Sequence, residues 1–239
     1  MMIARIMGVY VGFVVLLGGI VALDSLKKVR RKWEELPETI WPLHALFAGV
    51  LLLFISGLLE LFIWKIYRSP QFMAISIGLI EESLKLTPAL FLFGRLERSR
   101  LWKLTLGIAM VFAAFETISY ISAFILASAQ SGTQILLFSV RLIVIVFHVL
   151  WTVVPLSYLL YGKKREALAG WIFAVFAHAI YDYPVLAASA GEKETIILAG
   201  VFLSILFILY LKIAVGRALQ IVVKKENHLL PALNLSCSS

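Results

Sequence analysis

Residues 71–93 read QFMAISIGLIEESLKLTPALFLF, an apolar stretch long enough to cross a membrane that carries Glu81, Glu82 and Lys85 near its middle. On insertion scales, an Asp, Lys or Arg at a helix centre costs about 2.5–3.5 kcal/mol, whereas each Leu, Ile or Phe returns about 0.3–0.6 kcal/mol. With Glu counted like Asp, the three ionisable residues cost about 8–10 kcal/mol, and the Leu, Ile and Phe residues return at most about 6 kcal/mol. The difference predicts partners for these charges on other helices at the same depth.

The composition of the whole chain is that of a membrane protein. Hydrophobic residues make up 62% of the 239 positions and charged residues 15%, and the mean hydropathy is +0.96. These values predict an all-α, polytopic membrane helical bundle that forms one domain over residues 1–239, with no separate soluble domain. The single Cys237 excludes an intramolecular disulfide and a cysteine-based metal site.

Seven apolar segments are long enough to span a hydrocarbon core of about 30 Å. They cover residues 3–23, 43–64, 71–93, 104–128, 135–161, 169–188 and 195–216. We expect the first to be a membrane anchor rather than a cleaved signal peptide, because its basic cluster follows the apolar run and no A-x-A site ends it. Residues 24–41 are expected to form a short amphipathic connection at the membrane surface, and residues 224–239 a loose tail.

Basic residues alternate between the two sides of these spans. The first, third and fifth connections and the C-terminal tail carry 16 of the 22 Lys and Arg residues: Lys27, Lys28, Arg30, Arg31, Lys32, Arg95, Arg98, Arg100, Lys103, Lys163, Lys164, Arg165, Lys212, Arg217, Lys224 and Lys225. The opposite side carries four: Arg5, Lys65, Arg68 and Lys193. This asymmetry predicts a cell-membrane protein with its N-terminus outside and its C-terminus in the cytoplasm, so the net charge of +8 reflects topology and not a nucleic-acid partner.

Several ionisable side chains fall inside the predicted spans: Glu60, Glu81, Glu82, Lys85, Glu116, Arg141, His148, His178 and Asp182. At 1.5 Å per residue, Glu81 lies about 15 Å from the outer end of its helix and His148 about 20 Å. By the same measure, Glu116 lies about 18 Å and His178 about 14 Å from the inner ends of theirs. Four helices therefore bring a carboxylate or an imidazole to the middle of the bilayer, where such residues mark functional sites. Glu60, near an outer helix end, is expected at the interface.

Helical spacing places some of these side chains on common faces. Glu81 and Lys85 are four residues apart, as are His178 and Asp182, and Arg141 and His148 are seven apart. Glu81 and Glu82 point about 100° apart, so we expect one to face the cavity and the other to pair with Lys85. Pro88 and Pro184 each remove a backbone donor, which frees the carbonyls of residues 84 and 180 beside the two charged motifs.

These residues resemble a known family. Four elements follow one another along the chain, each near the middle of a predicted helix: Glu81-Glu82-x-x-Lys85, Phe112-x-x-x-Glu116 with Tyr120 one turn later, Arg141 with His148, and His178-x-x-x-Asp182. In order and position they are similar to the motifs of the PrsW family of intramembrane proteases, which is related to the CAAX prenyl protease superfamily. The resemblance covers residues 71–188. It implies a helical membrane endopeptidase that cleaves single-pass membrane proteins such as anti-sigma factors, with these glutamates and histidines in its active site. Two positions depart from the pattern: Thr117 and Asp182 stand where the family carries Asn.

Peptide hydrolysis needs a base for water, donors for the oxyanion and a proton for the leaving amine. We expect Glu81 with Glu116 to activate the water, His178 oriented by Asp182 to act as an oxyanion donor, and His148 to be a second donor or a proton shuttle. The candidate catalytic residues are Glu81, Glu82, Glu116, His148, His178 and Asp182, with Lys85, Arg141 and Tyr120 in support.

The sequence favours a glutamate-activated water without a cofactor. The chain has no H-E-x-x-H helix, and Lys85 and Arg141 already supply positive charge. The closest alternative is zinc bound by Glu81, Glu116, His148 and His178. A transporter or proton relay would also use buried ionisable groups, but no inverted repeat is evident. A scaffold that binds a partner helix without cleaving it is the remaining alternative.

Overall fold

A computed structural model describes residues 2–36, 42–126 and 131–236 of the chain. Its elements are α1 (Met2–Phe13), the π-helical turn η1 (Val14–Gly18), α2 (Gly19–Glu35), α3 (Pro42–Ile66), α4 (Pro70–Leu92), α5 (Arg98–Leu126), α6 (Ser131–Tyr161), α7 (Lys164–Ser189) and α8 (Glu194–Ser236). No strand is found in these three ranges. Because α1, η1 and α2 follow one another without a break, the fold is an all-α bundle of seven helical rods.

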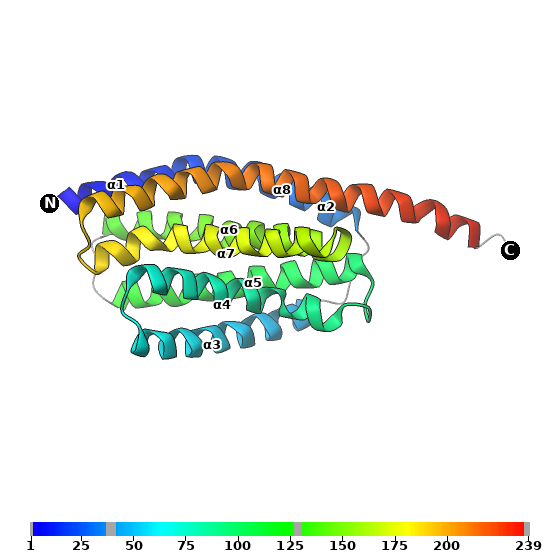
Figure 1. Cartoon of the computed structure of the whole chain (residues 1–239), viewed down its shortest axis with the longest axis horizontal. Coiled ribbons are helices and arrows are strands. Elements are labelled where there is room, and N and C mark those ends of the chain that lie inside the picture. The colour runs from blue at the N-terminus through cyan, green and yellow to red at the C-terminus, as the bar shows by residue number, and fades with distance from the viewer. Residues whose placement is uncertain (1, 37–41, 127–130, 237–239) are drawn as a thin grey trace.

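The rods lie roughly antiparallel, and each rod runs in the opposite direction to the one before it in the chain (Figure 1). The basic connections and the C-terminus lie at one end. Six helices of the described chain are long and apolar enough to cross a membrane. The exception is α4, whose middle carries Glu81, Glu82 and Lys85. The seven rods match the seven expected segments, while their orientation in the membrane stays a prediction.

Both terminal rods are longer than expected. Asp24–Glu35 continues the first rod as α2 instead of forming a short surface connection, and residues 37–41 lie outside the described ranges. Two ion pairs at i,i+4 spacing support this segment, Asp24 with Lys28 at 3.2 Å and Arg30 with Glu34 at 2.7 Å. The expected loose tail is also helical, since α8 continues to Ser236 and projects beyond the bundle (Figure 1).

Helix α7 lies inside the bundle and packs against α4, α6 and α8. Its closest neighbour is α4, because a Cβ atom at Gly78 would lie only 2.6 Å from the carbonyl oxygen of Val175 and 3.4 Å from the Cβ of His178. Only a residue without a side chain fits at this crossing. The absence of a side chain at Gly78 thus brings the backbone of α4 close to the part of α7 that carries His178.

Two hydroxyl groups from other helices hold α7 one turn further along. The Ser204 hydroxyl of α8 donates to the Ile180 carbonyl at 2.6 Å, which is the acceptor that Pro184 was expected to free. The Tyr10 hydroxyl of α1 donates to the Tyr181 carbonyl at 2.7 Å. The proline-interrupted segment of α7 is therefore satisfied by neighbouring helices and kept rigid beside Asp182.

Candidate active site

Four helices bring ionisable side chains together in the interior of the bundle. Glu81, Glu82 and Lys85 of α4, His148 of α6 and His178 of α7 are all buried. Glu116 of α5 reaches the same cluster, with a side chain that is 12% exposed. The structure thus assembles the site residues that the sequence predicted at the middle of four spans.

Lys85 lies at the centre of the cluster. Its Nζ atom is 2.7 Å from Glu82 Oε1 and 3.4 Å from Glu81 Oε2, so it contacts both carboxylates. The same ammonium lies 2.6 Å from His148 Nδ1 and 5.1 Å from the centre of the Phe112 ring. An ammonium has only donors, so His148 Nδ1 must accept here and its proton must be on Nε2. Glu82 is the closer partner of Lys85, but both glutamates contact this ammonium and both are buried, so the expected division into one cavity-facing and one paired glutamate is met only in part.

His148 lies between two glutamates. Its Nδ1 atom is 3.6 Å from Glu81 Oε2, and its Nε2 atom is 3.0 Å from Glu116 Oε2. Arg141 NH1 lies 3.5 Å from the other oxygen of Glu116. The imidazole ring thus joins Lys85 on its Nδ1 side to Glu116 on its Nε2 side.

His178 has a carboxylate on each side of its ring. Nε2 lies 3.2 Å from Asp182 Oδ2, and Nδ1 lies 2.9 Å from Glu82 Oε1 and 3.9 Å from Glu81 Oε2. If Nε2 donates its proton to Asp182, then Nδ1 and the Glu82 carboxylate are both acceptors, and they can lie at this distance only with a proton or a cation between them. Asp182 therefore contacts the ring at the expected i,i+4 spacing, and Nδ1 shares a proton or a metal ion with the α4 carboxylates.

An indole ring that the sequence reasoning overlooked closes one side of the cluster. The ring of Trp151 stacks on His178 at a centroid distance of 4.8 Å and meets His148 edge-on at 5.3 Å. Trp151 follows His148 by three residues and so lies on the same helix face, which is the signal that could have identified it. The indole fixes both imidazoles and keeps water away from that side.

Glu60 of α3 also lies nearer to the site than expected. It was predicted to be interfacial, but it is partly buried and accepts a hydrogen bond from Ser56 at 2.6 Å. Its carboxylate interacts electrostatically with Glu116, His178 and Asp182. Glu60 is therefore a fifth carboxyl group in the surroundings of the cluster.

A groove of about 580 Å³ runs between α3 and α5 and reaches the cluster at Glu116. Its α3 wall is apolar and includes Phe54 and Leu58. The α5 wall ends at Tyr120, whose ring carries the Arg141 guanidinium at 3.5 Å from its centre. Glu116 thus belongs to both the buried cluster and the groove, and Arg141 covers the ring of Tyr120 at the end of the groove.

The cluster has the chemistry of a metal centre. Donor atoms of Glu81, His148 and His178 lie within 4.8 Å of one another, and three such ligands leave room for a water at a catalytic zinc. The far nitrogens of both histidines face carboxylates, Glu116 and Asp182, as the second shell of zinc-binding histidines requires. Glu116 therefore lies behind His148 rather than in the ligand group, which differs from the four-residue zinc set considered from the sequence.

The acidic side chains of the cluster and an unpaired carboxylate oxygen of Glu82 also support a bound metal ion. The carboxyl groups of Glu81, Glu82, Glu116 and Asp182 outnumber the two basic side chains Lys85 and Arg141 that contact them, and this excess of acidic ligands would favour a bound cation. The buried Oε2 atom of Glu82 has no hydrogen-bond partner among the described residues. Such an orphaned acceptor calls for a water or an ion. The residues present therefore fit zinc.

A bundle of membrane-spanning helices with a buried cluster of glutamates and histidines is the architecture expected of an intramembrane hydrolase. The sequence matches the PrsW-protease family, described as PrsW family intramembrane metalloprotease, over residues 39–212, and the chain belongs to this family. It is accordingly a multi-pass membrane protein and an intramembrane peptidase whose substrate is a membrane protein in the lipid bilayer. No curated protein and no solved structure matches it.

Proposed function

We propose that the chain cleaves single-pass membrane proteins, regulators such as anti-sigma factors among them, at a zinc centre held by Glu81, His148 and His178. The whole chain, residues 1–239, would form the protease domain around the core of residues 71–188. The observation that carries the proposal is the convergence of these three donor groups, each histidine backed by a carboxylate on its far nitrogen. When bound, zinc would polarise the scissile carbonyl and make water a nucleophile near neutral pH.

Glu116 is the residue that we assign as general base and general acid. Glu116 accepts the proton of the attacking water, because it is the cluster carboxylate that also lines the open groove. As the tetrahedral intermediate collapses and the C–N bond breaks, Glu116 returns the proton to the leaving amine. Arg141, 3.5 Å away, stabilises the ionised form of Glu116 between these steps.

Other residues hold the reacting groups in place. His148 links Glu116 to the ligand group through its Nε2 atom. Asp182 fixes the His178 ring, and Trp151 packs against both imidazoles. Lys85 neutralises Glu82 and stabilises the oxyanion through its positive field.

The groove between α3 and α5 supplies a route for the substrate. Its apolar α3 wall suits a lipid-embedded segment, and Glu116 and Ser119 supply polar atoms where a peptide would arrive. A helical segment buries its peptide bonds in hydrogen bonds, so it must unwind before water can attack. We therefore expect cleavage near the membrane end of the substrate helix or at a Gly or Pro within it.

A metal-free mechanism is the second candidate. It is favoured by the contact of Lys85 Nζ with His148 Nδ1 at 2.6 Å, because a metal ion and the ammonium compete for the same lone pair. In that mechanism Glu81 and Glu116 alone bind and activate the water, as the sequence favoured. Metal dependence of the purified protein separates the two.

The proteolytic function is tested with purified protein reconstituted beside a library of single-pass helices, with product masses locating each cut. Glu116→Gln keeps the shape but removes the base, so cleavage should fall by at least about 10². Glu97→Gln is the matched control, because Glu97 is exposed and pairs only with Arg100 among the described residues. Intact substrates throughout the library, or equal cleavage by Glu116→Gln and wild type, would refute the proposal.

A further inference from the structure

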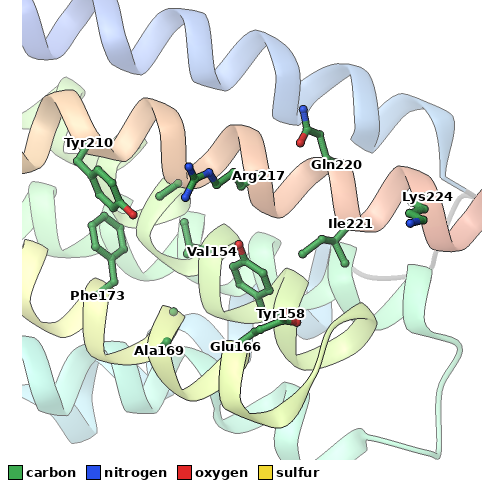
Figure 2. A pocket seen from close by; sticks show the side chains of 12 residues that line it. Val154, Tyr158, Glu166, Ala169, Phe173, Tyr210, Arg217, Gln220, Ile221 and Lys224 are labelled. Atoms are coloured by element: carbon green, nitrogen blue, oxygen red, sulfur yellow. The ribbon is translucent and has the colours of Figure 1, made fainter.

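A second polar cavity lies away from the catalytic cluster. It has a volume of about 530 Å³ and is enclosed by α6, the beginning of α7 and the C-terminal half of α8 (Figure 2). None of its lining residues belongs to the glutamate and histidine cluster. Its lining residues Tyr158 and Glu166 flank the Gly162–Lys163 connection between α6 and α7. This connection lies at the same end of the bundle as the C-terminal part of α8 (Figure 1). The proteolytic chemistry described above does not use it.

The cavity has an apolar part and a polar part. Phe173 and Tyr210 meet edge to face at 5.5 Å between ring centres and line the part nearer the membrane middle. Arg217 and Lys224 line it further along α8, and the Tyr158 hydroxyl points toward α8 (Figure 2). From Tyr210 to Lys224 the helix rises by about 21 Å, which is sufficient for a phosphate head group and the upper part of an acyl chain.

The basic side chains of this cavity are available to a ligand. Arg217 and Lys224 are exposed, and neither forms an ion pair in the described part of the chain. The single acidic residue of the lining, Glu166, accepts a hydrogen bond from the Lys163 amide at 2.8 Å and so caps α7. Residues 163–165 add two lysines and an arginine at the same end. The local charge is therefore positive.

We propose that this cavity is a binding site for an anionic phospholipid such as phosphatidylglycerol, with its phosphate at Arg217 and Lys224 and an acyl chain along Phe173 and Tyr210. Basic pockets between transmembrane helices bind anionic head groups. The Tyr158 hydroxyl and the Gln220 amide supply donors for the phosphate or glycerol oxygens. An apolar extension and a basic rim in one cavity fit a phospholipid better than a soluble anion.

The binding test uses native mass spectrometry of the full-length protein with dioleoylphosphatidylglycerol and, separately, dioleoylphosphatidylcholine. Wild type should bind one phosphatidylglycerol in preference to phosphatidylcholine. Arg217→Gln and Lys224→Gln should each weaken this binding about fivefold, and the double variant about thirtyfold. Lys225→Gln is the matched control, since it removes the same charge from the adjacent position outside the cavity. An equal effect of Lys225→Gln would show nonspecific surface attraction and overturn the proposal.

A second pair of variants tests the acyl-chain part without changing any charge. Ala169 lines the cavity with an exposed side chain, whereas its neighbour Leu168 is exposed and lies outside it. Ala169→Phe should fill the space and lower phosphatidylglycerol binding, and Leu168→Phe should leave it unchanged. Soluble glycerol 3-phosphate or an acidic peptide should not displace the lipid at millimolar concentration. Displacement by either, or full binding by Ala169→Phe, would refute a lipid site.

Discussion

The close crossing of α4 and α7 at Gly78 allows a quantitative prediction for Gly78→Ala. The added Cβ would lie 2.6 Å from the Val175 carbonyl oxygen and 3.2 Å from the Ala179 nitrogen, both backbone atoms that cannot rotate away. Ordinary van der Waals contact begins at 3.4 Å, so the two helices must separate by about 0.8 Å. Glu82 lies one turn from Gly78 on the same helix, so this displacement carries it away from His178.

The effect on activity should exceed the effect on stability. Overpacking costs about 1–3 kcal/mol, and the better helix propensity of Ala offsets about 1 kcal/mol of this. We therefore expect a loss of at most about 2 kcal/mol in the free energy of unfolding. The distance from Glu82 Oε1 to His178 Nδ1, now 2.9 Å, would exceed the hydrogen-bond limit. Because a 1 Å misplacement at a catalytic site can cost about 10²-fold, cleavage should fall by about 10–100-fold.

The assay compares initial cleavage rates of one single-pass substrate in proteoliposomes with thermal unfolding of the same preparations. Gly216→Ala is the control, since a Cβ at Gly216 meets nothing within 4 Å, and it should leave the rate unchanged with an equal or slightly higher Tm. A Gly78→Ala protein that cleaves at the wild-type rate would refute the argument that this crossing sets the geometry of Glu82 and His178.

Three further predictions concern the cluster and the topology. Lys85→Met leaves two buried carboxylates without their cation, so it should lower the free energy of unfolding by about 3–5 kcal/mol. Chemical unfolding in detergent measures this, and an unchanged unfolding midpoint would contradict it. Asp182→Asn should keep the cleavage rate within about tenfold of wild type, since the amide oxygen can still accept a hydrogen bond from His178. Asp182→Ala should lower the rate by about 10–100-fold, and equal rates for the two variants would exclude an orienting role for Asp182. In a Cys237→Ser background, a cysteine at Arg31 should react only with cytoplasmic reagent, and labelling only from outside would reverse the topology.

Sequence periodicity predicted the contacts that lie within one helix. The i,i+4 spacing of Glu81 with Lys85 and of His178 with Asp182 corresponds to contacts at 3.4 and 3.2 Å. The depth argument also predicted correctly that four helices share the cluster. It could not predict which atoms meet, such as Lys85 Nζ and His148 Nδ1, because those contacts depend on helix rotation and on close crossings such as that at Gly78.

The deviations from expectation have physical causes as well. The mixed charges of residues 24–35 were interpreted as a surface connection, but their i,i+4 pairs stabilise a continuing helix. Glu60 was assigned to the interface from its depth alone. Its proximity to the cluster depends on the packing of α3 against α5, which the sequence does not reveal.

The most direct test of the account is the metal dependence of cleavage by a single preparation whose metal content is measured. We predict stoichiometric zinc, cleavage that is lost on exhaustive chelation and restored by zinc, and loss of both zinc and cleavage in His178→Ala. Full cleavage by protein shown to be free of metal would contradict a zinc centre at Glu81, His148 and His178, and would leave the glutamates to activate the water alone.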